Sequence, residues 1–396
     1  EVNQFRYIGS KSGATTSFVV KNTASELVLC NNNGYKTPVV ESISMNPIKA
    51  ASNQAKLLII THKNLMDGAN EYAAYKISKG FNTAIVTTED LYNQFYYGQH
   101  HPLAIKNFVR YLMSGATIRP EYLLLLGKGY ELPRLRLDDD LVPTMGYPPS
   151  DTYLTSEIVD NTMAPALATG RVPAKTNDDV RTYLNKLKQY DQQDNFIWRK
   201  NIINITGGAN NSEDISFSGY LKNLSAIADK EYFGAKTINY YKSVTDPVTD
   251  NLMAKISGNI NDGVSVLNFL GHGSTTTTAV SIGNPSFLNN SNKLLLYIIN
   301  GCSTGNAFVN GSLGEDYIFQ NNKGAIAWFG ASSQGLASYL YNYTRLFYQN
   351  AFNTNYGGSI AQNMARAARA YQHPSDTWNW AHLRQYVLLG DPTVSL

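Results

Sequence analysis

From residue 56 to the end of the chain, short apolar runs alternate with amphipathic segments. Leu57–Thr61 and Tyr122–Leu126 are almost continuously apolar, as are strands that are buried on both faces of a parallel sheet. Between such runs, Gly68–Lys79 and Pro102–Ser114 place apolar residues at helical spacing, which predicts helices that pack through one face. Strands that alternate with helices indicate an α/β fold with a mainly parallel sheet.

The same alternation defines the remaining elements. Further strands are expected at Thr83–Thr87, Ala166–Arg171, Asn201–Thr206, Lys236–Tyr240, Ser265–Leu270, Leu294–Ile299 and Ala325–Gly330. Further helices are expected at Asp178–Gln192, Ser216–Glu231, Val248–Gly258, Gly314–Phe319, Ser338–Phe352 and Gly358–Tyr371. We expect Asn177 to cap the helix that begins at Asp178, because its side chain can accept a hydrogen bond from the first turn.

The first 55 residues lack this alternation. Ser17–Val20 and Glu26–Cys30 are short β-like runs between clusters of Gly, Ser and Asn, and no helical period appears. We therefore divide the chain into a β-rich leader or remnant of an upstream module (1–55), an α/β subdomain A (56–198) and an α/β subdomain B (199–396). Each subdomain is expected to contain a mainly parallel sheet flanked by helices.

Composition narrows the functional classes. The chain of 396 residues carries a formal net charge of +3, and 16% of its residues are charged, against about 25% in an average protein. It contains no run of Lys and Arg, which argues against nucleic-acid binding, and no stretch of about 18 apolar residues that would predict a membrane span. The many Asn, Ser, Thr and Tyr residues suit an extracellular or outer-membrane surface protein.

The two cysteines, Cys30 and Cys302, are far apart in the sequence. A disulfide between them is one alternative, although a single bridge is a poor framework for so long a chain. The other alternative is that at least one thiol is kept for its reactivity. The neighbours of Cys302 favour this second interpretation.

Two apolar runs end in glycine-flanked turns, 271–274 with His272 and 301–305 with Cys302. In open α/β sheets, ligands bind at the carboxyl ends of the strands. The two residues are 30 positions apart, about the length of one crossover between neighbouring parallel strands. We therefore expect a catalytic dyad in which His272 takes the proton of the Cys302 thiol. The amides of Gly273 and Cys302 are expected to form an oxyanion hole.

Structural interpretations compete with this dyad. A lone buried Cys is usually an inert apolar residue, but two such turns at crossover spacing favour catalysis. No other His stands at ligand spacing from His272, so we expect no catalytic metal and no required cofactor. The run Asp138–Asp140 lacks EF-hand spacing, so a solvated loop is favoured over a structural Ca²⁺ site. Gly127–Gly129 lacks the full phosphate-loop pattern, and no Gly-x-Ser-x-Gly elbow occurs.

These features resemble the gingipain-type cysteine peptidases, family C25 of the caspase-like clan. The resemblance covers residues 56–396 and includes, besides the two turns, the motifs Ser150–Tyr153, Gly170-Arg171, Gly324–Ala327 and Leu388–Pro392. It implies a caspase/gingipain-like fold of two α/β subdomains, with His272 as general base or acid and Cys302 as nucleophile. It also implies a protein or peptide substrate.

Two positions depart from the family pattern, and at a third the match is incomplete because the loop length differs. Thr206 stands before Gly207-Gly208, where the family places an acidic residue beside the catalytic His, which predicts an imidazolium without a carboxylate partner. Asp214 lies near the position of a pocket acid in Arg-specific members, and Leu336 stands where those members place a Trp over the pocket. Both are candidate substrate-binding residues, and with Leu336 in place of the Trp we do not expect Arg specificity.

The segment Asp90–Phe108 resembles the sortase branch of the family, which belongs to the type IX secretion system of the Bacteroidetes. That branch removes C-terminal sorting signals from cargo and can attach the cargo to a surface lipopolysaccharide. The expected function is therefore a cysteine endopeptidase or transpeptidase that acts through an acyl-enzyme, with other secretion components as partners. Two alternatives stay open: a catalytically degenerate binding or structural domain of the same machinery, and a hydrolase of a non-peptide ester or amide.

Overall fold

The computed structural model describes residues 10–12, 15–17, 39–40, 42, 44–132, 139–160, 162–192, 196–230, 232–241, 250–373 and 375–396. The chain divides into two compact units, Glu1–Ser44 and Met45–Leu396. In the first unit, β1 (Ser10–Ser12) pairs antiparallel with β2 (Thr15–Ser17). The β-like run expected at Glu26–Cys30 lies outside the described residues.

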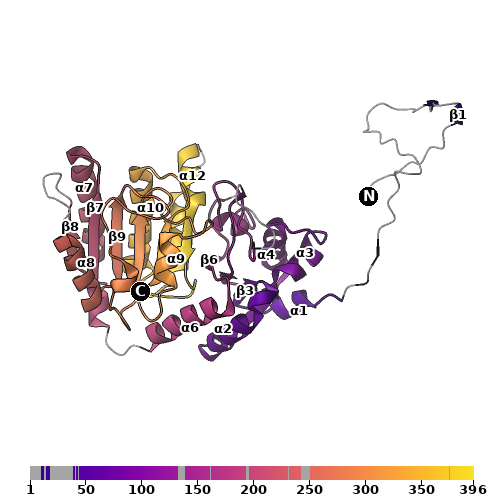
Figure 1. Ribbon diagram of the computed structural model, residues 1–396, viewed down its shortest axis with the longest axis horizontal. Coiled ribbons are helices and arrows are strands. Elements are labelled where there is room, and N and C mark those ends of the chain that lie inside the picture. The colour runs from indigo at the N-terminus through magenta and orange to yellow at the C-terminus, as the bar shows by residue number, and fades with distance from the viewer. Residues whose placement is uncertain are drawn as a thin grey trace. The chain divides into compact units, whose positions relative to one another are not determined.

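A ten-stranded sheet forms the centre of the Met45–Leu396 unit (Figure 1). Across the sheet the strands are β4 (Thr83–Thr87), β3 (Leu57–Thr61), β5 (Tyr122–Leu126), β6 (Ala168–Val172), β12 (Tyr386–Leu389), β11 (Ala325–Ala331), β10 (Leu295–Asn300), β9 (Val266–Gly271), β7 (Asn201–Gly207) and β8 (Lys236–Tyr240). Neighbours in this order are parallel, except that β12 is antiparallel to β11. The expected mainly parallel α/β fold is confirmed. Strands from 56–198 and from 199–396 lie in one continuous sheet, joined where β6 pairs with β12.

Helices cover both faces of this sheet (Figure 1). They are α1 (Ile48–Ser52), α2 (Met66–Ser78), α3 (Thr88–Phe95), α4 (Leu103–Gly115), α5 (Thr152–Thr155), α6 (Asn177–Asp191), α7 (Asn211–Ala228), α8 (Asp250–Asp262), α9 (Leu313–Ile318), α10 (Ala337–Gln349), α11 (Ile360–Tyr371) and α12 (Thr377–Gln385). In the described part of the chain, none of the helices combines the length and the apolar character needed to span a bilayer.

Consecutive residues of β3 face opposite sides of the sheet, as the two-residue period of a strand requires. Leu58 and Ile60 pack with α3 and α4 in one apolar cluster. Leu57 and Ile59 belong to the larger apolar cluster, which includes buried residues of α2 and α6. The continuous apolar run in the sequence therefore reflects burial on both faces.

The cap of α6 differs from the one expected. Thr176 begins the helix: its Oγ1 accepts a hydrogen bond from the Asp179 N–H (3.1 Å), and the Asp179 carboxylate accepts one from the Thr176 N–H (3.0 Å). The prediction that Asn177 caps this helix was wrong by one residue. The Asn177 Oδ1 instead accepts a hydrogen bond from the Gly68 N–H (2.8 Å), so this side chain joins α6 to α2.

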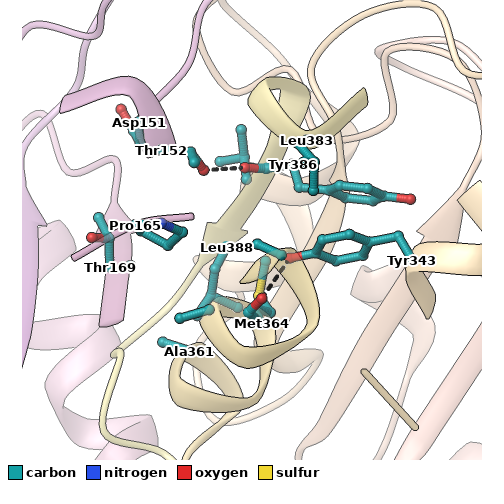
Figure 2. A pocket seen from close by; sticks show the side chains of 14 residues that line it. Asp151, Thr152, Pro165, Thr169, Tyr343, Ala361, Met364, Leu383, Tyr386 and Leu388 are labelled. Atoms are coloured by element: carbon teal, nitrogen blue, oxygen red, sulfur yellow. Dashed lines mark hydrogen bonds between the residues drawn. The ribbon is translucent and has the colours of Figure 1, made fainter. Parts of the chain in front are cut away.

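A small cavity lies beside the junction of β6 and β12 (Figure 2). The Tyr343 hydroxyl donates to the Met364 carbonyl (2.9 Å), and the Thr152 hydroxyl donates to the Tyr386 carbonyl (3.2 Å). The cavity volume of about 20 Å³ is enough for roughly one water molecule. Its lining contains none of the predicted site residues, so this cavity is a feature of helix packing at the junction.

Candidate active site

His272 lies in the turn that directly follows β9. Its N–H donates to the carbonyl of Gly207 at the end of the neighbouring strand β7 (3.0 Å). Its own carbonyl accepts a hydrogen bond from the Ala279 N–H (2.8 Å). Hydrogen bonds on both sides therefore fix the histidine at the carboxyl edge of β9.

Cys302 lies in a tight turn that follows β10. The Thr304 hydroxyl donates to the Ile299 carbonyl (2.6 Å) and closes this turn. Ser303 has a φ of 58°, which non-glycine residues rarely adopt, and its N–H donates to the Ser333 carbonyl in the loop after β11 (2.8 Å). Cys302 is a free, half-buried thiol, while Cys30 lies outside the described residues.

The two turns touch each other, because β9 and β10 are neighbours in the sheet. A Cβ atom added to Gly301 would lie 3.0 Å from the Gly271 carbonyl oxygen and 3.3 Å from the Gly273 nitrogen. A Cβ atom added to Gly273 would lie 2.7 Å from the Cγ2 atom of Thr304. Glycine is therefore needed at both positions for this close approach. The structure brings together the His272 and Cys302 turns, with the Gly273 amide between them.

The Cys302 sulfur contacts the loop after β11. The Gly335 N–H donates to Sγ at 3.5 Å, and the Gly335 carbonyl oxygen lies 3.8 Å from the same sulfur. An amide donor stabilises a thiolate, and a carbonyl can accept the proton of a neutral thiol. No hydrogen bond joins the Cys302 sulfur to the His272 ring among the contacts of these two described residues; catalytic hydrogen bonds are often long before substrate binds.

The His272 ring is paired with a carboxylate. Its Nε2 lies 2.9 Å from Oε2 of Glu213, which stands in the first turn of α7. The same oxygen accepts a hydrogen bond from the Ala209 N–H (2.8 Å). The hydrogen bond from the Ala209 amide, and to a lesser extent that from the His272 ring, holds the pKa of Glu213 below its usual value. This carboxylate therefore stays charged. Nε2 faces Glu213, so Nδ1 is the ring nitrogen that points to another partner.

Glu213 is a candidate site residue that the sequence pattern did not single out. The expectation of an unpartnered imidazolium came from Thr206, which is buried in β7. It was wrong, because the carboxylate comes from the following helix. The signal was present: Asn210 caps α7 by accepting a hydrogen bond from the Glu213 N–H (3.0 Å), and an Asn followed three residues later by Glu is typical of a helix start.

The structure places the two candidate substrate-binding residues differently. Asp214 is buried, and its Oδ1 accepts a hydrogen bond from the Gly208 N–H (2.9 Å). Its Oδ2 is also buried and has no hydrogen-bond partner among the described residues. Leu336 is 47% exposed and follows Gly335, the residue that contacts the Cys302 sulfur. Both assignments stay predictions.

Other residues singled out in the sequence have structural contacts. Burial lowers the pKa of Lys128 to about 8, and its ammonium donates to the carbonyls of Ala307 (2.8 Å) and Val309 (2.6 Å) and to Glu315. Asp140 is buried and accepts a hydrogen bond from the Tyr130 N–H (2.9 Å), while Asp138 lies outside the described residues. Within the described residues, no group of three or more His, Cys, Asp or Glu is arranged to hold a metal ion.

Comparison with known proteins identifies the family of the chain. The sequence model of Peptidase family C25 matches residues 50–396. The chain belongs to peptidase family C25. The resemblance inferred from the sequence motifs is thereby confirmed, as is the expectation of a cysteine peptidase at the level of the family.

One curated protein and two solved structures are similar to this chain. Gingipain R2 of Porphyromonas gingivalis (strain ATCC BAA-308 / W83) is 22% identical over 321 residues, which are 76% of this chain and 39% of that protein. The chain therefore spans less than half the length of this curated relative. The crystal structure of the Arg-specific cysteine proteinase gingipain R (RgpB) matches with a TM-score of 0.70 at 17% identity, over 91% of this chain and 80% of that one. The complex of the Porphyromonas gingivalis RgpB pro- and mature domains also matches with a TM-score of 0.70, at 18% identity, over 86% of this chain and 79% of that one.

Proposed function

We propose that this C25 chain is a cysteine endopeptidase in which Cys302 is the nucleophile and His272 the general base. The observation that carries the proposal is the hydrogen bond of 2.9 Å between His272 Nε2 and Glu213. A base oriented by a third group, next to a free thiol, is the arrangement that activates a nucleophile. The carboxylate also favours the imidazolium that forms when the thiol loses its proton.

The chemistry follows from these positions. The thiol proton passes to Nδ1 of His272, and the sulfur attacks the carbonyl carbon of the scissile peptide. The amides of Gly273 and Cys302 stabilise the resulting oxyanion. When the tetrahedral intermediate collapses, the C–N bond breaks, the imidazolium gives its proton to the leaving amine, and a thioester remains on Cys302. Water then releases a carboxylic acid, or an amine forms a new peptide bond.

The second outcome connects the site to a finer proposal, a sortase-like role in type IX secretion. Removal of a C-terminal sorting signal would leave the cargo as a thioester, and an amine on a surface lipopolysaccharide would accept it. The support for this role is the resemblance of Asp90–Phe108, which forms α3, the loop after it and the start of α4. These helices pack against β4 and β3, at the opposite end of the sheet from β9 and β10. Other secretion components as partners and an extracellular or outer-membrane location belong to the same proposal.

The alternative of a catalytically degenerate domain loses its main support. It was motivated by Thr206, which cannot supply a charge, and by Leu336 in place of a Trp. Glu213 does supply a charge beside His272, which answers the first of these grounds and leaves the second as it was. Membership of a peptidase family favours peptides over other esters and amides as substrates. Catalysis on a protein substrate is therefore the better supported function.

Turnover of a fluorogenic peptide library by the purified chain tests this proposal. Cys302→Ala is expected to abolish cleavage, and His272→Ala to lower kcat by roughly 10²–10⁴-fold, the usual contribution of general acid–base catalysis. The exposed His373 provides the control, because His373→Ala removes an imidazole outside the site. Full cleavage by Cys302→Ala would refute the assignment of the nucleophile. A thiol-reactive peptide probe that labels the wild type but no longer labels His272→Ala would separate an enzyme from a binding domain.

A further inference from the structure

His382 on α12 is buried, with 1% of its surface exposed. The Leu336 N–H donates a hydrogen bond to its Nε2 (2.9 Å), and Nδ1 lies 2.6 Å from the Trp378 carbonyl oxygen. An amide N–H can only donate, so Nε2 must be the unprotonated nitrogen, and a carbonyl can only accept, so Nδ1 must carry the proton. Both contacts are satisfied only by a neutral imidazole in this one tautomer.

The helices around His382 hold its ring in place. Tyr339 of α10 stacks on the ring, with the centroids 4.8 Å apart and the planes 17° apart. The Tyr339 hydroxyl in turn donates to Asp376, the cap of α12 (3.0 Å). Burial lowers the pKa of His382 below its usual value, which agrees with a neutral ring. α10 and α12 pack side by side (Figure 1), so the imidazole is a fixed point between them.

The peptide that His382 holds is next to the Cys302 sulfur. Leu336 follows Gly335, whose N–H and carbonyl oxygen lie 3.5 Å and 3.8 Å from Sγ. A Cβ atom on Gly335 would lie 2.7 Å from the Leu340 side chain, so the loop is pressed against α10 at this point. Ser332 N–H, at the other end of the loop, donates to the carbonyl of Gln385 in α12 (2.8 Å). The segment 332–336 is therefore fixed to α12 at both ends.

We propose that His382 is a positioning residue for the nucleophile: its Nε2 holds the Leu336 amide and thereby sets the Gly335 N–H against the Cys302 sulfur. This inference rests on the proposed role of Cys302. The Gly335 amide donates to Sγ and so holds the sulfur in the position from which it attacks. Loss of the His382 acceptor frees the Leu336 amide and lets the Gly335 peptide move away from Sγ.

The test measures Cys302 itself, through the second-order rate of its alkylation by iodoacetamide at pH 7. His382→Leu removes the acceptor at similar volume and is expected to lower this rate and kcat roughly tenfold, the effect of one lost hydrogen bond, with little change in KM. His382→Gln offers an amide oxygen near the position of Nε2 and is expected to recover most of the rate. The folded state of each variant is checked by its thermal midpoint.

A second pair of variants removes the same hydrogen bond from the other side. Leu336→Pro replaces the N–H by the ring Cδ atom, which cannot fit within the 2.9 Å between the amide nitrogen and Nε2. The variant therefore removes the hydrogen bond and also displaces the segment from His382. Leu336→Ala loses the same side chain but keeps the N–H, so it is expected to alkylate near the wild-type rate while Leu336→Pro is slower.

The proposal is overturned if His382→Leu alkylates at the wild-type rate, or if His382→Gln is as slow as His382→Leu while both are folded. Equal rates for Leu336→Pro and Leu336→Ala would also overturn it. Failure of the proposed function gives a different result. A Cys302→Ala protein that still cleaves peptides would refute Cys302 as the nucleophile, whereas the alkylation rates of the His382 and Leu336 variants would be unaffected.

Discussion

Glu213 and His272 are 59 residues apart in the sequence, and their side chains form a hydrogen bond of 2.9 Å at the carboxyl edge of the sheet. The carboxylate comes from the first turn of α7 and the imidazole from the turn after β9. β7 leads into α7 and pairs with β9, so the sheet itself brings the two residues together. The acidic partner of the histidine is thus supplied by a helix start, where the amide of Ala209 also binds it.

Glu213→Gln is expected to lower kcat/KM roughly 10²-fold, the lower end of what general acid–base assistance contributes. The amide keeps the size of the side chain but removes the charge that stabilises the imidazolium. Because the pair is largely exposed, its loss should change the free energy of unfolding by less than about 1 kcal/mol. Peptide turnover and thermal denaturation measure the two effects. Glu71→Gln, which breaks an exposed ion pair with Arg181, is the control, and equal activity of the two variants would contradict a catalytic role for Glu213.

The sequence revealed those site residues whose own segment carries a recognisable pattern of apolar residues and glycines. The strands that position His272 and Cys302 were predicted to within one residue, because their runs are mostly apolar and each is followed by a glycine. Glu213 was missed because the helix was expected to start at Ser216 and in fact starts at Asn211, which left the acid in an assumed loop. The contact between Gly335 and Cys302 joins the loop after β11 to the turn after β10. A contact between two loops produces no periodic pattern in the sequence, so it could not be predicted.

The strands of the sheet also differ in how clearly the sequence predicts them. Four strands were predicted with the bounds that the structure has: Leu57–Thr61, Thr83–Thr87, Tyr122–Leu126 and Lys236–Tyr240. β12 (Tyr386–Leu389) was not expected as a strand, although its sequence was noted as a motif. This strand has four residues, follows α12 directly and is antiparallel to β11. It therefore does not belong to a strand-helix-strand unit, which is the pattern that predicted the other strands. Its place between β6 and β11 depends on tertiary packing alone.

Gly301→Ala is expected to lower kcat roughly tenfold, because the catalytic turns must shift by a few tenths of an ångström, less than the misplacement of about 1 Å that can lower a rate 10²-fold. The added Cβ would lie 3.0 Å from the Gly271 carbonyl oxygen and 3.3 Å from the Gly273 nitrogen. Since both neighbours are backbone atoms, the His272 and Cys302 turns must move apart. Peptide turnover measures the loss, and circular dichroism confirms that the variant is folded.

Gly219→Ala provides the matched control for this change. Gly219 lies inside α7, and no atom stands within 4 Å of its added Cβ. Alanine in a helix interior stabilises by roughly 0.8–1 kcal/mol relative to glycine. This variant should therefore keep its activity and unfold at a higher temperature. If Gly301→Ala were as active as Gly219→Ala, close contact of the two turns would not matter for catalysis.

The proposed thioester on Cys302 predicts that an added amine competes with water. With a cleavable peptide and increasing glycinamide, the fraction of product that carries the amine should rise with amine concentration, because both nucleophiles attack the same acyl-enzyme. Mass spectrometry of the products measures this fraction. Cys302→Ala should give neither product. If only the hydrolysed product forms at saturating amine, the site is a plain endopeptidase and the transpeptidase role fails.

Asp391 connects the end of the chain to α2, and this contact should make stability depend on pH. The carboxylate is fully buried, lies 3.1 Å from the Lys76 ammonium and accepts hydrogen bonds from the Tyr72 hydroxyl and the Thr393 N–H, both at 2.6 Å. Burial opposes the charge, but Lys76 and the hydrogen bonds from Thr393 and Tyr72 outweigh it and hold the pKa of Asp391 below its usual value. Removing one partner of a buried pair typically costs about 3–5 kcal/mol, so Asp391→Asn should destabilise the fold by that amount at pH 7.

The sign of the pH effect follows from the lowered pKa. As the pH falls toward and below about 4, the unfolded chain binds a proton at Asp391 before the folded protein does, so the stabilisation is lost as the pH passes through the folded pKa. The difference in unfolding free energy between wild type and Asp391→Asn should therefore be constant from pH 7 to pH 5 and shrink below about pH 4. Urea denaturation at each pH measures it, with the exposed Asp178→Asn as a control that changes stability by less than about 0.5 kcal/mol. A difference that grows as the pH falls would show that the buried carboxylate has a raised pKa and that Lys76 does not stabilise its charge.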